Sequence, residues 1–293
     1  RGRISPAPQA TGRQRLMVLL RARGLAVAQM NQPAAVSPDG EFEFRGVAPG
    51  SYTLVAMVPE RGGGGLAARV PLEVGTAPVE NLSVVMSPPL PVAGTVRLSG
   101  QEAAAAGVRI SLRPREPFGF GMQSLTATAE AGGAFAFPAV TPDHYDLAIS
   151  GLPEGYYIQS ATAAGRDVLL AGLDLTSGNP GPIQVVLGAK AGQAGGLVQN
   201  DRQEPVPGAT VVLVPQEEER RPVRLYYHAV TTDETGAFVL DNLAPGTYKV
   251  YGWTEVEPGA YYDPDFMRPF ENAGESLTIR EGSREEIKVR LIG

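Results

Sequence analysis

The stretch between Tyr251 and Phe270 has the residue types best suited to binding a ligand. Aromatic rings can stack on sugar rings, and clustered carboxylates can hold calcium through oxygen ligands. We therefore expect a binding site here, with a glycan as a possible ligand; Asp263-Pro-Asp265 lacks the ligand count of an EF-hand loop, so no metal site is predicted. The expected site residues are Trp253, the only tryptophan, and Tyr261, Tyr262, Asp263 and Asp265, with Phe266, Phe270, Glu255 and Glu257 nearby.

The alternative is that this long loop folds onto its own domain and that its aromatic residues anchor it there. A comparable aromatic loop, Pro153-Glu-Gly-Tyr-Tyr-Ile158, lies about a hundred residues earlier. A loop that recurs in this way favours a structural role.

Residue types that usually carry catalysis are scarce. The chain has no cysteine, which excludes disulfides, thiolate metal sites and cysteine nucleophiles. Of its two histidines, His144 lies in a turn and His228 in a predicted strand, and neither has a second histidine or cysteine nearby to form a metal set. No nucleophile elbow is present. We predict that the protein has no catalytic residue, binds no cofactor and is not an enzyme.

Two further stretches are expected to be ordinary surface loops. Arg61-Gly-Gly-Gly-Gly-Leu66 lacks the Lys-Ser/Thr ending of a phosphate loop, so we interpret it as a flexible hairpin tip. Glu217-Glu-Glu-Arg-Arg221 is expected to be a solvated turn between strands. The alanine-rich run from Glu102 to Gly107 is too short to form a stable helix.

A repeated pattern shows which elements must position these residues. In three places a glycine is followed after two residues by Phe, after nine by Pro and after twelve by Tyr, without a gap. A short strand after a glycine precedes each copy, and an alternating strand closes it. The three copies begin at Gly40, Gly133 and Gly236, and their tyrosines are Tyr52, Tyr145 and Tyr248. The repeat predicts three tandem modules at residues 1–88, 89–188 and 189–293.

Alternation with period two predicts antiparallel strands that have one buried and one wet face. Ala209, Val211 and Leu213 are expected to face inward, and Val212 outward. The glycine before each Phe supplies the positive φ of a tight hairpin turn. The Pro-Gly-x-Tyr segment predicts a corner at which the tyrosine buries its ring and bonds its hydroxyl to nearby backbone, a structural role. About seven strands per module suit a two-sheet sandwich.

Charge and hydrophobicity limit the classes of partner that the protein can bind. The three predicted modules carry formal charges of +3, −3 and −6, and none is basic enough for nucleic acid. No stretch approaches 18 apolar residues, so no membrane span is predicted. Because Arg1 already lies in a predicted strand and no signal peptide precedes it, we expect a processed or trimmed chain.

The third copy, Gly236-Ala-Phe-Val-Leu-Asp-Asn-Leu-Ala-Pro-Gly-Thr-Tyr-Lys-Val, resembles the carboxypeptidase regulatory-like domain, as does the stretch from Gly196 to Leu213. The resemblance extends to all three copies and implies a seven-stranded, transthyretin-like or immunoglobulin-like all-β sandwich. Such modules are non-catalytic and occur in exported bacterial proteins, so it also implies an extracellular, cell-surface or periplasmic location.

Collagen-adhesin B-type modules, which the chain also resembles, can form a Lys–Asn isopeptide bond promoted by an acid four residues after the corner tyrosine. Here those positions are Ala56, Ile149 and Gly252, and the chain has only three lysines. This departure argues against internal isopeptide bonds.

Three functions remain open. The first is a structural or adhesive array that associates with itself or with protein partners, in one version a filament built by strand addition with Arg1 to Pro8 as the donor strand. The second is an array of carbohydrate-binding modules, or accessory domains of an exported enzyme or outer-membrane transporter. The third is a hydrolase, which rests on the family name alone.

Overall fold

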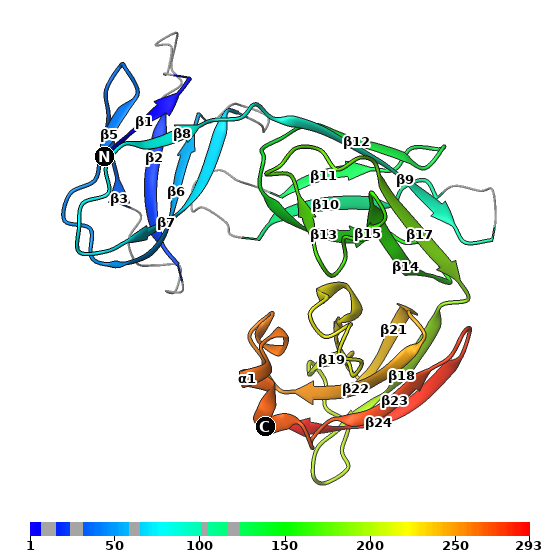
Figure 1. Ribbon diagram of the computed structural model, residues 1–293. Coiled ribbons are helices and arrows are strands. Elements are labelled where there is room, and N and C mark those ends of the chain that lie inside the picture. Colours follow the sequence, from blue (N-terminus) through cyan, green and yellow to red (C-terminus); the bar gives the residue numbers. More distant parts are fainter. Residues whose placement is uncertain (7–15, 24–31, 59–64, 101–104, 116–123) are drawn as a thin grey trace.

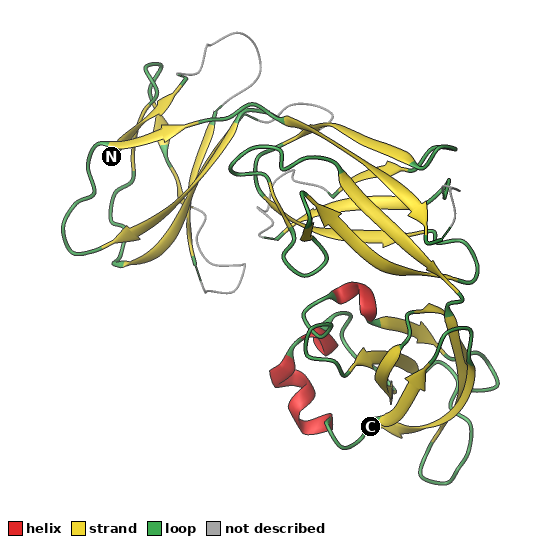
Figure 2. Ribbon diagram, turned by 45° about the vertical axis from the view of Figure 1, so that its right-hand side comes forward, coloured by secondary structure: helices red, strands yellow, loops and turns green. Residues whose placement is uncertain are grey.

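The computed structural model describes residues 1–6, 16–23, 32–58, 65–100, 105–115 and 124–293 (Figure 1). Within these ranges the chain forms 24 strands, one four-residue helix and three 3-10 helices, so the all-β prediction is confirmed (Figure 2). The predicted glycine-rich tip, the first residues of the alanine-rich run and the end of the proposed donor strand lie outside the described residues.

The first group of strands forms two four-stranded sheets, with the orders β4-β5-β1-β8 and β3-β2-β6-β7. A core cluster that includes Ile4, Leu54 and Val84 lies between them. The strands are β1 (Gly2–Ser5), β2 (Met17–Ala22), β3 (Gln32–Pro33), β4 (Ala35–Val36), β5 (Glu41–Glu43), β6 (Gly50–Met57), β7 (Ala67–Val74) and β8 (Leu82–Val85).

The second group also forms two sheets, with the orders β11-β10-β13-β16 and β12-β9-β17-β14-β15. One core fills the space between them. The strands are β9 (Leu90–Leu98), β10 (Arg109–Pro114), β11 (Leu125–Thr128), β12 (Ala134–Val140), β13 (His144–Ser150), β14 (Tyr156–Ala163), β15 (Arg166–Asp167), β16 (Leu173–Asp174) and β17 (Ile183–Ala189).

The third group has seven strands in one continuous sheet of order β20-β19-β22-β24-β18-β21, with β23 beside β22, folded around its own core. The strands are β18 (Gly192–Gln199), β19 (Thr210–Pro215), β20 (His228–Thr231), β21 (Ala237–Leu243), β22 (Gly246–Trp253), β23 (Glu275–Ile279) and β24 (Arg284–Ile292). The helices are η1 (Arg224–Tyr226), η2 (Ala260–Tyr262), α1 (Pro264–Met267) and η3 (Arg268–Phe270).

We call these groups the first, second and third sandwich. The predicted domain boundaries at 88/89 and 188/189 stay a prediction, and β17 continues one residue past the second of them.

The repeated Gly–Phe pair has a steric cause. The glycine of each first strand lies directly opposite the phenylalanine of the strand that follows the repeated turn: Gly2 opposite Phe42, Gly94 opposite Phe135, and Gly196 opposite Phe238. A Cβ on Gly94 would lie 2.3 Å from the Phe135 ring. The positive φ predicted for the turns is confirmed, since Gly40, Gly133 and Gly236 have φ of 80°, 74° and 77°. The hairpin is confirmed for the first copy, in which β4 pairs with β5, and was wrong for the other two, because β11 and β12, like β20 and β21, do not pair with each other.

Each sandwich contains one mixed sheet, which corrects the prediction of purely antiparallel sandwiches. In each sandwich the first strand pairs in parallel with the last: β1 with β8, β9 with β17, and β18 with β24. Both strands therefore run the same way, and the chain enters at one end of the sandwich and leaves at the other. β9 has nine residues, so this displacement is about 30 Å.

The inward stripe of β19 is as predicted, with Ala209, Val211 and Leu213 at most 1% exposed. The prediction that Val212 faces water was wrong, because Val212 is fully buried. Its side chain lies on the outer face of the sheet, beneath a second apolar cluster that includes Trp253 and Tyr261.

Candidate functional site

The three corner tyrosines have the same hydrogen bond. Each hydroxyl donates to the carbonyl oxygen four residues earlier: Tyr52 to Ala48 at 2.9 Å, Tyr145 to Thr141 at 2.7 Å and Tyr248 to Ala244 at 2.8 Å. Tyr145 and Tyr248 are almost fully buried, whereas Tyr52 is half-buried. Burial raises the pKa of Tyr145 and raises the pKa of Tyr248 to about 12. This arrangement fits a structural role for all three.

Substituting Tyr248→Phe should cost about 1 kcal/mol, because the buried Ala244 carbonyl loses its donor. The pKa of Tyr248 is higher in the folded state than in the unfolded state, so its contribution is present below pH 10 and is lost as pH rises toward 12. Urea unfolding between neutral pH and pH 11 measures both effects. The variant should show a weaker alkaline loss than the parent protein, and an unchanged alkaline loss would contradict this assignment.

The aromatic residues of the predicted ligand site form a cap on the outer face of the third sandwich. Trp253 and Tyr251 are each 3% exposed, and their rings stack with centroids 5.3 Å apart. Phe270 meets the Trp253 ring edge-on at 5.8 Å, and Phe266 lies 6.5 Å from it. Because the faces of Trp253 are covered, the ring is not presented as a platform for a sugar.

Tyr261 and Tyr262 belong to the same cap. Their rings lie 4.7 Å apart, and both contact Tyr227, which comes from the loop between β19 and β20. Arg224 lies over the Tyr262 ring with its guanidinium carbon 5.0 Å from the centroid. The structure thus brings the predicted aromatic residues together, in the packed arrangement of the alternative interpretation.

The predicted carboxylates have local partners. Asp263 caps α1 by accepting from the backbone nitrogen of Asp265 at 2.9 Å, and Asp265 forms an ion pair with Arg268. Both carboxylates are exposed. Among the described residues no group of three or more His, Cys, Asp and Glu side chains is close enough to hold a metal ion.

The two histidines lie in separate sandwiches. His144 Nε2 is 3.6 Å from Asp174 Oδ2 at the corner of the second sandwich. Burial lowers the pKa of His228 in β20 to about 4, so this side chain is neutral at pH 7. They share no site.

The loop Glu217–Arg221 was expected to be a solvated turn, and this was wrong for two of its residues. Glu217 Oε1 accepts from the backbone nitrogen and the hydroxyl of Thr247, at 2.7 and 3.1 Å, and Arg220 donates to Pro245 at 2.7 Å. These bonds lie at the corner, where glycine at position 246 leaves room for both side chains. Glu218 and Glu219 are exposed, as expected.

A buried ion pair joins the first two sandwiches, and sequence reasoning missed it. Arg69 on β7 lies 2.8 Å from Asp143 Oδ2, and their side chains are 14% and 1% exposed. Asp143 stands at the corner position that is Gly50 in the first copy and Gly246 in the third. The departure from glycine was the one signal in the sequence for this contact, and nothing marked Arg69 as its partner.

The linkers on either side of the second sandwich are short and hydrogen-bonded. Between β8 and β9, Ser87 pairs with Ala67, and two prolines follow. Between β17 and β18, Ala191 donates to Gly155 of the second sandwich at 2.8 Å, and Lys190 accepts from Gly282 of the third at 2.7 Å. The first linker is thereby bonded to the first sandwich, and the second linker to the sandwiches on both of its sides.

The second and third sandwiches also touch through side chains. Leu225 of η1 packs against the core cluster of the second sandwich. Burial raises the pKa of its neighbour Tyr226, whose ring lies under Arg220 with the guanidinium carbon 4.8 Å from the centroid. In both views, η1 lies on the side of the third sandwich that faces the second (Figure 2).

Residues 194–261 match the family model of the carboxypeptidase regulatory-like domain. The predicted resemblance is confirmed for this segment. No curated protein matches the chain. The matched residues run from β18 into η2, so they include the corner and, of the cap, Tyr251, Trp253 and Tyr261. The match ends before Tyr262, Asp263, Asp265, Phe266 and Phe270.

Solved structures show a looser likeness to the whole chain. A streptococcal ancillary pilin is 13% identical, with 99% of this chain and 97% of that chain covered, at a TM-score of 0.29. The major pilin subunit of Bacillus cereus is 11% identical, with coverages of 98% and 97% and a TM-score of 0.25. The Bacillus anthracis TIE protein is 12% identical at a TM-score of 0.28, and this chain spans 49% of its length. TM-scores this low support no conclusion about function.

Proposed function

We propose that this protein is an exported, non-catalytic structural protein. Its β-sandwiches form a stiff array that spaces or assembles other components at the bacterial cell surface. The parallel pairing of first and last strands carries the proposal, because it makes the chain enter and leave each sandwich at opposite ends. Each sandwich therefore extends the array by about a strand length.

Stiff joints support this function. The buried Arg69–Asp143 pair and the packing of Leu225 on the second core both restrict how neighbouring sandwiches move. The linkers leave two to four residues between consecutive strands. In the described part of the chain no helix is long and apolar enough to cross a membrane.

Distances between spin labels test the stiffness directly, since the chain has no native cysteine. Asp39, Glu130 and Glu234 are exposed and lie in or beside the tight turns before β5, β12 and β21. Labels at Asp39→Cys with Glu130→Cys, and at Glu130→Cys with Glu234→Cys, should each give one narrow distance distribution. Inserting Gly-Gly-Ser between Lys190 and Ala191 should broaden only the second.

Broad distributions in the parent protein would contradict a stiff array. Reproducible turnover in a peptidase and esterase panel would contradict the non-catalytic assignment. Binding on glycan arrays that is lost in Trp253→Phe but retained in Tyr248→Phe would instead favour the carbohydrate-binding alternative.

A further inference from the structure

The last strand of the third sandwich is paired on one side only along most of its length. β18 pairs with β24 from Arg284 to Arg290. On the other side, β22 reaches only Leu291 and Ile292. No other strand in the described part of the chain pairs with β24. The stretch from Arg284 to Arg290, which we call the β24 edge, can therefore bind a further strand through backbone hydrogen bonds.

Three residues of the β24 edge direct their backbone groups outward. The Gln193 nitrogen donates to the Ser283 carbonyl, so the odd-numbered residues of β24 bond to β18 in this parallel ladder. The N–H and C=O groups of Arg284, Glu286 and Lys288 therefore point away from β18. A strand that adds here would bond to these residues without breaking a hydrogen bond of the sandwich.

The second sandwich shows which kind of segment fits this position. Its last strand, β17, is the equivalent of β24, and β14 pairs with its outer side antiparallel. Ile183 of β17 lies opposite Gly94 of the repeat and is fully buried. Ile287 of β24 lies opposite Gly196 and is half-buried. In the third sandwich the segment that follows β22 forms the cap instead, and the position beside β24 is left to another strand.

The joints along the chain do not use this edge. Arg69 of β7 and Asp143 form the first joint, and Leu225 of η1 contacts the second sandwich at the other. The second sandwich has a neighbour at each end, and β17 still pairs only with strands of its own sandwich. The β24 edge is therefore a lateral surface, separate from the surfaces that connect consecutive sandwiches.

The side chains of the β24 edge carry charges of both signs on the outer face of the sheet. Arg290 forms an ion pair with Asp201 at 2.7 Å. The other charges of this edge have no ion pair with another described residue. The exposed charged residues are Arg284, Glu286, Lys288 and Arg290.

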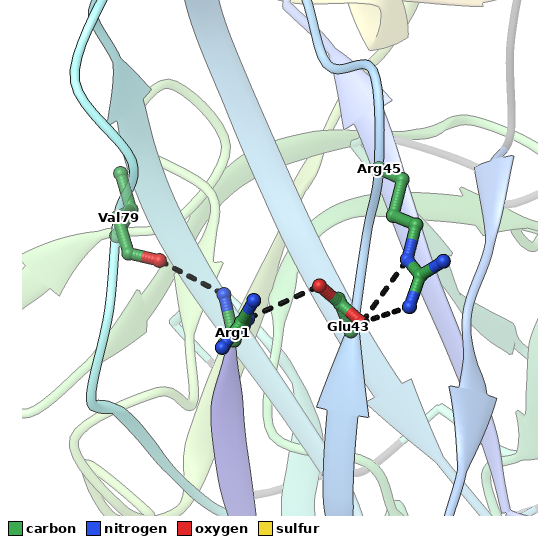
Figure 3. Close-up of polar contacts among 4 residues, drawn as sticks. All are labelled: Arg1, Glu43, Arg45 and Val79. Atoms are coloured by element: carbon green, nitrogen blue, oxygen red, sulfur yellow. Dashed lines mark hydrogen bonds and ion pairs between the residues drawn. The ribbon is translucent and has the colours of Figure 1, made fainter.

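The equivalent sheet of the first sandwich compensates its charges internally. Glu43 on β5 accepts from Arg1 Nε at 3.1 Å and from Arg45 Nη2 at 2.9 Å (Figure 3). Glu286 and Lys288 have no such partners among the described residues. Their charges are therefore available to another molecule.

We propose that two copies of this chain associate by antiparallel pairing of β24 with β24, about a two-fold axis at Ile287. In this register Glu286 of each copy lies opposite Lys288 of the other, so opposite charges meet twice. The two sheets then join in the order β21-β18-β24-β24-β18-β21. The inference rests on the proposed array function, because a second copy is then one of the components that the array assembles.

Charge selects this register over its neighbours. Because only alternate residues point outward, the next possible axes lie at Glu286 and at Lys288. Each of these would place identical charges opposite each other, which is unfavourable. With the axis at Ile287, Arg284 lies opposite Arg290, whose charge is already compensated by Asp201.

Strand addition by Arg1 to Pro8, the predicted route to a filament, would require β1 to leave its own sheet. β1 lies between β5 and β8, and Ile4 is 1% exposed in the core. Pairing at the β24 edge needs no such rearrangement, because the outward groups of β24 already face away from the sandwich.

Sedimentation velocity of the full chain over about a hundredfold concentration range should show a reversible monomer–dimer equilibrium. Glu286→Lys and Lys288→Glu should each weaken dimerisation at least about tenfold, because each places like charges opposite each other. An equimolar mixture of the two variants should dimerise again, since every lysine at these positions then faces a glutamate. Two variants that had merely lost their fold would not restore each other.

Glu234→Lys is the matched control. It reverses an exposed charge in the turn before β21 and changes the net charge by as much as Glu286→Lys. If net charge alone governed association, both variants would dimerise more tightly than the parent protein, because residues 189–293 carry a formal charge of −6. Pairing at the β24 edge predicts that only Glu286→Lys weakens the dimer.

Single cysteines locate the axis, since the chain has no native cysteine. Ile287 would face its own copy as a non-hydrogen-bonded pair, with Cα atoms about 4.5 Å apart. A disulfide spans this separation, so Ile287→Cys should form a covalent dimer under mild oxidation. Glu285→Cys lies on the same face but about 13 Å along the strand from its own copy, and it should not.

A chain that stays monomeric throughout the concentration range would overturn the proposal. A mixture of Glu286→Lys and Lys288→Glu that dimerises no better than either variant alone would do the same, as would equal cross-linking through Glu285→Cys and Ile287→Cys. Narrow spin-label distances in a strictly monomeric chain would leave the stiff array standing and remove only this interface. Broad distances in a chain that dimerises as described would instead remove the stiff array and leave the interface.

Discussion

Replacing Arg69 by leucine should destabilise the first two sandwiches by about 3–5 kcal/mol. Asp143 is 1% exposed, and Arg69 supplies the positive charge 2.8 Å from its carboxylate. Removing the guanidinium takes this positive charge away from a carboxylate that stays buried, and losing the compensation of a buried charge is costly. Urea unfolding of the full chain should show the affected transition at lower denaturant.

Two further variants test whether the loss of stability comes from breaking a buried ion pair. Asp143→Gly restores the residue of the other two corners, and combined with Arg69→Leu it should recover much of the lost stability because the buried carboxylate is removed together with its cation. Arg290→Leu breaks an ion pair of similar length, 2.7 Å to Asp201, whose side chains are 72% and 76% exposed. It should cost less than about 1 kcal/mol. Equal effects of Arg69→Leu and Arg290→Leu would show that burial of the first pair does not matter.

The same joint should govern the distance between labels at Asp39 and Glu130. In Arg69→Leu with Asp143→Gly, the fold of each sandwich is retained while the charged contact between them is gone. A broadened distribution in this double variant would show that the ion pair holds the joint. An unchanged narrow distribution would assign the stiffness to the linker at Ser87 and its two prolines.

Much of the fold could be predicted because it depends on local sequence patterns. The Gly–Phe pair, the positive-φ glycines and the Tyr corner each depend on residues close in sequence or on adjacent strands. The alternation of β19 identified the core-facing residues in the same way. Parallel closure of each sandwich was missed, since alternation fixes which face a residue occupies and not the direction of its partner strand.

What could not be predicted depends on segments meeting from a distance. The alternation predicted an exposed Val212, but in the structure the segment that follows β22 covers the outer face of its sheet. Glu217 and Arg220 were predicted to be solvated, but in the structure they bond to the corner at Gly246, 30 and 25 residues away in sequence. The composition of Tyr251–Phe270 matched both a binding platform and an anchored loop, and only the burial of Trp253 distinguishes the two geometries.

Substituting Trp253→Ala should therefore act mainly on stability, with a loss of about 3–5 kcal/mol in the third sandwich. The indole is 3% exposed and contacts Tyr251, Phe266 and Phe270, so truncation leaves a cavity beneath the cap. Hydrogen exchange measured by mass spectrometry reads this effect locally. Protection of β19 and β22 should fall by more than about a hundredfold, while peptides from the first sandwich keep theirs.

Trp253→Phe provides the control, because it keeps an aromatic ring in the cap. The indole N–H is buried and has no hydrogen-bond partner among the described residues, so removing it leaves no acceptor there without its donor. The expected cost is about 1.5 kcal/mol, set by the lost volume. If Trp253→Ala instead leaves protection of β22 unchanged, the cap does not depend on this packing. The aromatic residues of Tyr251–Phe270 would then have to be tested again as an open surface for a ligand.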